Sequence, residues 1–525
     1  PSIVKKTYKL RLLVLCVIPA AATFTTFAQQ KKSPIVAVIT VEGLTGEHLR
    51  LLESTFTGGG FKKIMHSGAS IDRIDFGPGL DYAAASAVVF SGASPIVNGV
   101  PADKVYDTST KLARSPLHNP AMIGNFTDET LSPEALKVST VADELRIDSD
   151  GQGRVFAVAP KAATALVGAA HAGNGAYWIN NMTANWATTA YYKEMPVPLR
   201  DRNYLNPLAT RLDTMKWTPL LNLSLYPGIT TAEMQKPFKN SFPRKEVRRV
   251  NRFIESPLAN TEVTDVAIDL ITKLSLGSGK ATDMITIGYT LPSDASRTET
   301  IDSYIRLDRD LERLFKALEQ ACPQGSGPTI MLAGLPSDNG SAPDDKRWNI
   351  PSGLYSVKRA VSLLGIHLMS VHGNGDWILG YHNRHFFLNR NLIKDRGLSL
   401  QDFRREVADF LGRMAGISNV ITIDDILASR AGDNPDALKR NTSFTHAGDI
   451  IIEVAPGWQI IDDGTGRASG ALRHTAADIP AFFVAPGLKR LQITESTDAR
   501  TLAPTLSRLL LIRAPNGASV PAINL

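Results

Sequence analysis

The chain has 525 residues, of which 43% are hydrophobic and 21% are charged, and its formal net charge is +6. This composition is typical of a globular protein with a large core, and it excludes the disordered and fibrous classes. Lys5, Lys6, Lys9 and Arg11 supply four of the positive charges, and the segment 1–28 contains no acid, so the rest of the chain carries +2. The charge therefore gives no support to a nucleic-acid partner.

The segment 1–28 has the pattern of a secretory signal peptide, with a basic start, an apolar run from Leu12 to Ala22, and small residues before Gln29. The apolar run is shorter than the ~20 residues that span a bilayer, which favours a removed signal over a membrane anchor. We expect a protein of the periplasm or cell surface, or a secreted one, with no transmembrane segment after signal removal. Lipidation at Cys16 is the less favoured alternative, because the bulky Leu15 precedes it.

Apolar runs predict buried strands, and we expect these strands to be parallel because helix-like patterns separate them. The runs are Ile35–Val41, Val155–Val158, Met284–Tyr289, Thr329–Ala333 and Ala481–Ala485. Residues 301–318 have apolar side chains spaced mostly three and four apart, as in an amphipathic helix. Strands that alternate with helices predict an α/β fold, a three-layer sandwich around a mostly parallel central sheet.

Two stretches depart from this alternation and are predicted to be inserted cap regions. Residues 179–256 are rich in Pro, Asn, Thr and aromatics, and residues 338–448 combine Gly/Asp/Asn loops with a second helix pattern. The predicted division is a signal peptide at 1–28, core segments at 29–178, 257–337 and 449–525, and insertions at 179–256 and 338–448. Two roles stay open for the aromatics of the first insertion, namely a contact face for a partner or packing onto the core. These aromatics are Trp186, Tyr191, Tyr192 and Trp217.

The stretch from Ile35 to Asp107 carries the most informative motifs. Its apolar strand ends in Glu42, and forty residues later a helix of Ala, Val and Ser begins at Tyr82 and closes in a small-residue loop. Further along the chain come AGNGAYW, YIRLDRDL, FFLNRNLI and IPAFFVAPG. Together these motifs resemble the alkaline phosphatase superfamily, specifically the bacterial alkaline phosphatases grouped with type I phosphodiesterases and nucleotide pyrophosphatases.

The resemblance implies two Zn ions, held by Asp and His, with a nucleophilic Thr or Ser between them. Glu42 takes the place of the metal-binding Asp at the end of the first strand, and Tyr82 takes the place of the nucleophile. The positions of the remaining ligands are filled by Ser86, by Leu335 and Pro336, or by Asp338 and Asn339 in a placement three residues later, and by Ser469. We therefore expect no bound cofactor, although two Zn ions are the norm of the family.

The resemblance also implies an Asn, a Lys and an Arg that hold phosphate. Asp103 matches the Asn, and its negative charge would repel a phosphate group. Lys161 matches the Lys, whereas Ala163 stands where the Arg would be. Asp103 and Lys161 are thus predicted to be remnants of a substrate site. Asp81, Glu42 and Asp103 together form a cluster of acidic residues that would at best hold a loosely bound Mg or Ca ion.

Two hypotheses follow from these substitutions. The first is a catalytically inactive pseudophosphatase that acts as a scaffold or binding partner of another cell-envelope protein. The alternative is a phosphate- or sulfate-ester hydrolase with an atypical centre that uses Tyr82, Glu42, Asp103 and Lys161. The histidines at 367, 372, 382 and 385 are the local His cluster of the sequence, and a packed or surface role is favoured for them over metal binding.

Overall fold

The computed structural model describes residues 32–293, 295–337, 351–429, 434–455, 457–462, 467–470 and 478–525. The predicted signal peptide and the alternative ligand positions Asp338 and Asn339 lie outside these ranges. Across the described ranges, no helix is long and apolar enough to cross a membrane.

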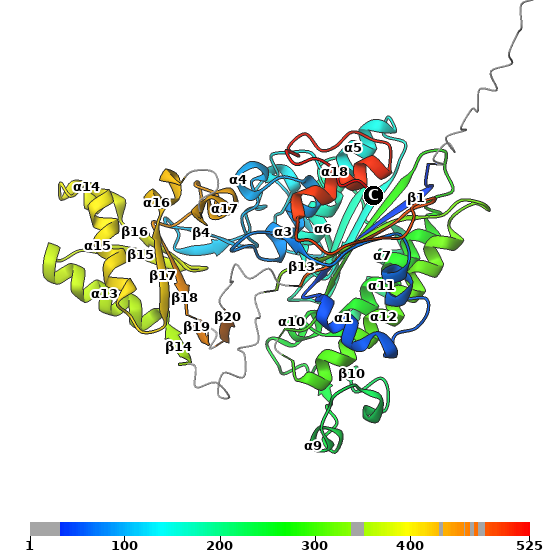
Figure 1. The fold of residues 1–525 in the computed structure, drawn as a ribbon, viewed down its shortest axis with the longest axis horizontal. Coiled ribbons are helices and arrows are strands. Elements are labelled where there is room, and N and C mark those ends of the chain that lie inside the picture. The colour runs from blue at the N-terminus through cyan, green and yellow to red at the C-terminus, as the bar shows by residue number, and fades with distance from the viewer. Residues whose placement is uncertain are drawn as a thin grey trace, which may run out of the picture. The chain divides into compact units, whose positions relative to one another are not determined.

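A ten-stranded mixed sheet forms the centre of the described structure (Figure 1). In spatial order its strands are β22 (Leu491–Ile493), β2 (Ala69–Ile71), β21 (Ala481–Val484), β13 (Thr329–Leu335), β1 (Ile35–Glu42), β12 (Asp283–Thr290), β7 (Val155–Ala159), β8 (Gly175–Ile179), β9 (Trp186–Thr189) and β6 (Gly124–Asn125). The five strands from β13 to β8 are parallel. The prediction of a mostly parallel central sheet is confirmed.

The expected direction of the last apolar run was wrong. Strand β21 pairs antiparallel with both β13 and β2. Its residues Ala481, Phe482 and Phe483 are buried, as a central strand requires. A continuous apolar run indicates that a strand is buried on both faces of its sheet. An antiparallel strand inside a mixed sheet is buried in the same way, so the run does not reveal the strand's direction.

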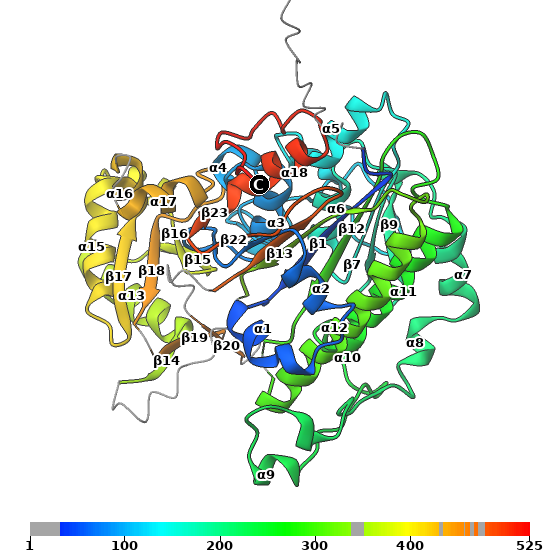
Figure 2. The same ribbon diagram turned by 45° about the vertical axis from the view of Figure 1, so that its right-hand side comes forward.

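Helices cover both faces of the sheet, which gives the three predicted layers (Figure 2). Ile35, Ala37 and Ile39 of β1 pack into one core, and Val36 and Val38 pack into the other, because successive side chains of a strand point to opposite faces. The first layer contains α1 (Gly46–Leu52), α2 (Phe61–His66), α11 (Pro257–Lys273) and α12 (Arg297–Gln320). The second contains α3 (Tyr82–Ser91), α5 (Val141–Asp148), α6 (Ala162–Ala169) and α18 (Leu502–Leu509).

The segment 179–256 packs mainly on the α11 side of the sheet, whereas Tyr191 and Tyr192 pack on the α6 side. Its regular elements after β9 are α7 (Val197–Leu205), α8 (Leu208–Arg211), β10 (Lys216–Trp217), α9 (Thr231–Met234), β11 (Asn240–Ser241) and α10 (Arg249–Ile254). Trp186 and Tyr192 are buried, and the indole of Trp217 donates to Asp302 of α12 at 2.6 Å. The aromatics that could have formed a contact face thus hold this segment onto the core, with Tyr191 half-buried beside Tyr192.

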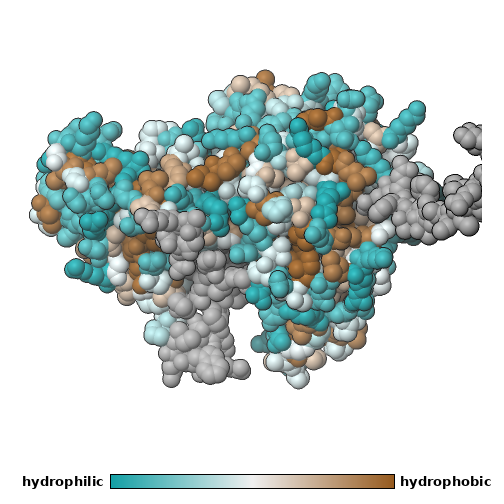
Figure 3. All heavy atoms as spheres, turned by 45° about the horizontal axis from the view of Figure 1, so that its top comes forward, coloured by the Kyte–Doolittle hydropathy of each residue, from teal (hydrophilic) through white to brown (hydrophobic). Residues whose placement is uncertain are grey.

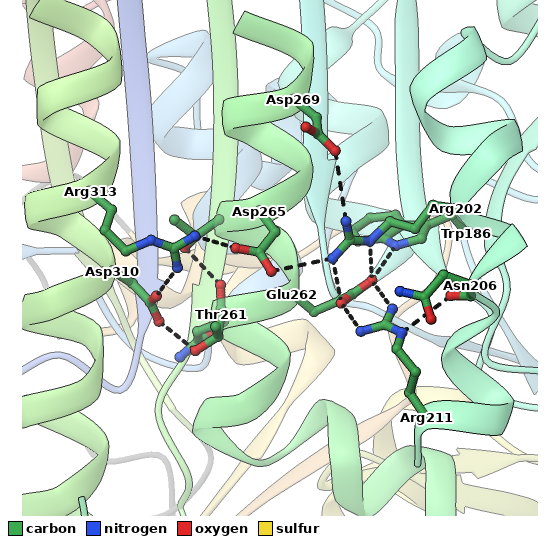
Figure 4. Close-up of polar contacts among 12 residues, drawn as sticks. Trp186, Arg202, Asn206, Arg211, Thr261, Glu262, Asp265, Asp269, Asp310 and Arg313 are labelled. Atoms are coloured by element: carbon green, nitrogen blue, oxygen red, sulfur yellow. Dashed lines mark hydrogen bonds and ion pairs between the residues drawn. The ribbon is translucent and has the colours of Figure 1, made fainter. Parts of the chain in front are cut away.

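A buried carboxylate fixes this segment to α11 (Figure 4). Glu262 accepts two hydrogen bonds from Arg202 of α7 at 2.7 and 2.8 Å, and two from Arg211 of α8 at 2.8 Å each. Trp186 donates its indole hydrogen to the same carboxylate at 3.0 Å. Burial raises the pKa of Glu262, but the two guanidinium groups outweigh burial and lower this pKa to about 2. The carboxylate is therefore charged and fully paired in the folded protein.

The inserted region after residue 350 has its own core, to which Leu364, Phe403 and Ile452 belong. Its strands form a four-stranded sheet in the order β15 (Ile378–His382), β16 (His385–Leu388), β18 (Ile450–Val454) and β17 (Ile417–Thr422), and a three-stranded sheet of β14 (Gly353–Ser356), β19 (Trp458–Asp462) and β20 (Arg467–Gly470). Its helices are α13 (Val357–His372), α14 (Arg390–Asp395), α15 (Leu400–Gly412), α16 (Ile423–Ala428) and α17 (Asn434–Asn441). Since β18 pairs with β16 and β17, we propose that the insertion ends nearer residue 480 than the expected 448.

Replacing Glu262 by Gln leaves two arginines beside a neutral group, and we expect the free energy of unfolding to fall by about 3 kcal/mol. The folded pKa lies below the ordinary 4.5, so the charged carboxylate stabilises the protein above pH 4.5, and this contribution is lost as pH falls toward 2. The difference in free energy of unfolding between wild type and Glu262→Gln, measured by urea unfolding, should shrink as the pH falls from 4.5 toward 2. The control is Asp269→Asn, because Asp269 lies 3.7 Å from Arg202 with a side chain 27% exposed, and we expect a loss below about 1 kcal/mol.

Candidate functional site

The carboxyl ends of three parallel strands meet at the predicted site. In the register of the sheet, Glu42 of β1 lies opposite Thr290 of β12 and Leu335 of β13. The hydroxyl of Thr290 lies 3.4 Å from the Glu42 carboxylate, and the side chain of Asn260 exchanges hydrogen bonds with the backbone of Thr290 at 2.8 and 3.0 Å. Thr290 was not predicted to be a site residue, although it directly follows a predicted strand, as Glu42 does.

Lys161 lies against two of the other predicted site residues. It is the N-cap residue of α6, directly after β7. Its ammonium nitrogen lies 2.5 Å from Oε2 of Glu42 and 4.0 Å from the centre of the Tyr82 ring. With the Lys161 and Glu42 side chains only 24% and 14% exposed, the charge pair is largely shielded from water. Lys161 thus supplies a positive charge to Glu42 and a cation–π contact to Tyr82.

Helix α3 places Tyr82 in its first turn. Asp81 is the N-cap residue, and its carboxylate accepts hydrogen bonds from the backbone amides of Ala83 and Ala84 at 3.0 Å each. The phenol of Tyr82 donates to Asp103 at 2.6 Å, and the backbone amide of Asp103 donates to Asp81 at 2.7 Å. Glu42, Lys161, Tyr82, Asp103 and Asp81 therefore form one connected group, which we call the strand-end network.

The electrostatics of the strand-end network oppose ionisation of the phenol. Burial raises the pKa of Tyr82 well above its usual value, and the negative charges of Asp103, Glu42 and Asp81 add to the rise. The hydrogen bond to Asp103 also favours the protonated phenol. Tyr82 is thus held as a hydrogen-bond donor, whereas a nucleophile at this position would have to lose its proton.

The other positions matched to family ligands carry few donor atoms. Leu335 is buried and its side chain has no polar atom, while its backbone carbonyl accepts from the backbone amide of Gly43 at 3.0 Å. Pro336 follows it, and Ser86 donates its hydroxyl to the carbonyl of Tyr82 at 2.7 Å. The backbone of Ser469 lies in β20, where it pairs with Ile460 of the inserted region.

These residues do not fit a two-Zn centre. Zn sites use about three or four Asp, His, Glu or Cys ligands per ion. In the ranges that the structure describes, no group of three or more such side chains could hold a metal ion. Leu335 and Pro336 have no side-chain donor, and Glu42 is already paired with an ammonium group.

The histidine cluster of the sequence is not one site. His367 and His372 of α13 both contact Glu406 of α15, at 3.2 and 2.8 Å. His382 lies 3.2 Å from the carbonyl of Lys104. Burial and the neighbouring Arg384 lower the pKa of His385 to about 3, so it stays neutral and accepts a hydrogen bond from the amide of Gly448.

Comparisons with known proteins find relatives over nearly the whole chain. No protein-family model matches the chain. It is 25% identical over 515 residues to alkaline phosphatase PhoV of Synechococcus elongatus, which covers 92% of this chain and 91% of PhoV. It is also 25% identical over 550 residues to a Myroides odoratus protein named calcium-transporting ATPase, covering 95% of this chain and 97% of that one.

The crystal structure of alkaline phosphatase PafA superposes with a TM-score of 0.80 at 22% identity, covering 94% of this chain and 98% of PafA. In sequence and in fold, this chain is therefore similar to proteins of the alkaline phosphatase superfamily. The murine ectonucleotide pyrophosphatase / phosphodiesterase 5 has the same fold at a TM-score of 0.52 and 11% identity. Within the superfamily fold, the strand-end network occupies the carboxyl edge of the central strands, where open α/β sheets bind their ligands.

A double-mutant cycle of Lys161→Met and Glu42→Gln should measure a coupling of about 1–3 kcal/mol in the free energy of unfolding, because the pair is largely shielded from solvent. The matched control is the pair Lys32 and Asp148, with side chains 48% and 35% exposed, for which we expect less than about 1 kcal/mol. Equal coupling energies in the two cycles would contradict a structural role for the Lys161 pair.

Proposed function

We propose that this member of the alkaline phosphatase superfamily is a catalytically inactive pseudophosphatase, a scaffold or binding partner for another protein of the cell envelope. The observation that carries the proposal is the position of Lys161, whose ammonium group joins Glu42 and Tyr82. The residues matched to a metal ligand and to the nucleophile are thus bound to each other by an internal cation. A periplasmic, surface or secreted location is part of the same proposal and rests on the signal-peptide pattern of the segment 1–28.

The charge of Lys161 supports the loss of metal chemistry. The Glu42 carboxylate already has an ammonium partner at 2.5 Å. It should therefore bind a metal ion more weakly than a solvated carboxylate would, because the ion would have to displace the lysine. Ala163, buried in α6, cannot supply the paired hydrogen bonds that an arginine gives a phosphate group. The phosphate-holding pair of the family is therefore reduced to a lysine that is engaged with Glu42.

The inserted region supports a partner-binding role. Along α13, Leu363, Ile366 and Met369 are 41%, 62% and 42% exposed, and their three-residue spacing places them on one side of the helix. Elsewhere on the surface, apolar residues gather in several patches among hydrophilic ones (Figure 3). We therefore place the proposed contact face at these exposed residues of α13 and not at the buried aromatics of 179–256.

The alternative is an ester hydrolase with an atypical centre. The contact between Tyr82 and Asp103 favours it, because a carboxylate 2.6 Å from a phenol is placed to take the phenol proton. The Tyr82 phenolate would then attack the phosphorus or sulfur of an ester, the bond to the ester's alcohol oxygen would break, and the alcohol would leave with the proton held by Asp103, while Lys161 beside the ring stabilises negative charge. The raised pKa of Tyr82 opposes this route, which is why we rank it second.

Elemental analysis and activity assays separate the two proposals. We expect well under one Zn per chain after purification without chelators, because the matched ligand positions carry few donors. We also expect no turnover of nitrophenyl phosphate, bis-nitrophenyl phosphate or nitrophenyl sulfate with added Zn or Mg, because the phenol of Tyr82 stays protonated. Stoichiometric Zn would sink the pseudophosphatase proposal. Turnover that disappears in Tyr82→Phe, with the unfolding midpoint unchanged, would establish the atypical hydrolase instead.

A further inference from the structure

A pocket lies where the inserted region meets the loops that flank α3. Pro78 and Gly79 line it before α3, and Lys104 and Tyr106 line it at β4 (Val105–Asp107). From the inserted region, the β15–β16 turn and the end of α17 complete the lining. The side-chain amide of Asn441 donates to the carbonyls of Phe76 and Pro78 at 2.9 Å each, which holds the two sides together.

The turn between β15 and β16 has an unusual residue choice. Asn383 and Arg384 both have positive φ angles, +46° and +69°. A two-residue hairpin turn of this kind favours Asn followed by Gly, because a side chain at the second position costs about 1–2 kcal/mol in the left-handed region. An arginine at this position despite that cost indicates a role for its side chain.

Arg384 is one of the residues that line the pocket. A Cβ atom added to Gly79 would lie 3.0 Å from Nη2 of Arg384, so the guanidinium group packs closely against the backbone of Gly79. Lys104 from the opposite side also lines the pocket. The acidic residue of the lining, Glu453, lies 3.5 Å from the amide of Asn419 on the neighbouring strand. Arg384 and Lys104, both positive at neutral pH, therefore line one pocket together with one acid, Glu453.

His446 adds a polar atom that has no protein partner. Its Nδ1 is buried and makes no hydrogen bond within the described part of the chain. Buried polar atoms are normally paired, so an unpaired one in a pocket wall indicates a bound group or water. Tyr106 and Phe387, which also line the pocket, pack with their ring centres 4.9 Å apart and give it an aromatic part.

We propose that this pocket binds a small organic anion, with its carboxylate or phosphate-type head on Arg384 and Lys104 and its apolar body against Tyr106 and Phe387. Arginine offers planar paired donors that suit both kinds of head group. This site is separate from the strand-end network, because neither Tyr82 nor Lys161 lines it. The proposal therefore holds whether or not the protein hydrolyses esters.

Titration calorimetry with phenylphosphonate, which has no ester bond, tests the proposal. We expect wild type to bind phenylphosphonate and benzoate, and to bind benzylamine at least tenfold more weakly. Arg384→Gly should weaken phenylphosphonate binding at least tenfold while the unfolding midpoint stays equal or rises, because glycine suits this turn. Lys104→Met, at an exposed position, should weaken binding at least threefold.

Two controls locate the bound anion. Lys316→Met, at an exposed position of α12, should keep the affinity of wild type. Lys161→Met should also keep it, because Lys161 belongs to the strand-end network. The proposal is overturned if wild type prefers benzylamine, if Arg384→Gly and Lys104→Met both bind as wild type does, or if only Lys161→Met loses binding. Should Arg384→Gly unfold, the result for Lys104→Met decides.

Discussion

Parallel pairing of β1 with β12 and β13 is the constraint on which the site depends. Parallel strands in register end at one edge, so the residues that close these strands, Glu42, Thr290 and Leu335, are brought together whatever their side chains are. Open α/β sheets bind their ligands at this edge, and in this chain the ion pair of Lys161 and Glu42 lies there. The sheet is stabilised by its apolar faces and not by the residues at its end, so the fold does not depend on the chemistry of those residues.

Lys161 helps to explain how the carboxylates at this edge are stabilised. Glu42, Asp81 and Asp103 would otherwise bring three carboxylates near the end of one sheet. Asp81 is satisfied by the amides of α3, Asp103 by the phenol of Tyr82, and Glu42 by the ammonium of Lys161. Each negative charge thus has a specific partner, as partly buried charges require. The same partners make each group less available for a metal or a substrate.

Much of the fold could be predicted from sequence, because apolar runs and helical spacing report burial directly. The runs at 35–41 and 329–333 correspond to β1 and β13, and the helix expected at 301–318 lies within α12. Strand direction at 481–484 could not be predicted, since burial is the same for both directions. The convergence of Tyr82, Asp103 and Lys161 followed from the family resemblance, whereas their mutual contacts depend on side-chain packing. The aromatics of 179–256 needed the structure, because Trp217 finds its partner Asp302 across 85 residues of sequence.

Strand β1 has partners that come much later in the chain. Ile35 pairs with Asp283, and Val36 pairs with Thr329, so both neighbours of β1 are made long after it. A ribosome adds about 5–20 residues per second, so an apolar strand made early would wait on the order of tens of seconds for its first neighbour. Contacts this distant also slow folding, because a long loop must close before they form. During that interval β1 presents an unpaired edge, and nascent chains of this protein should depend on chaperones that shield it.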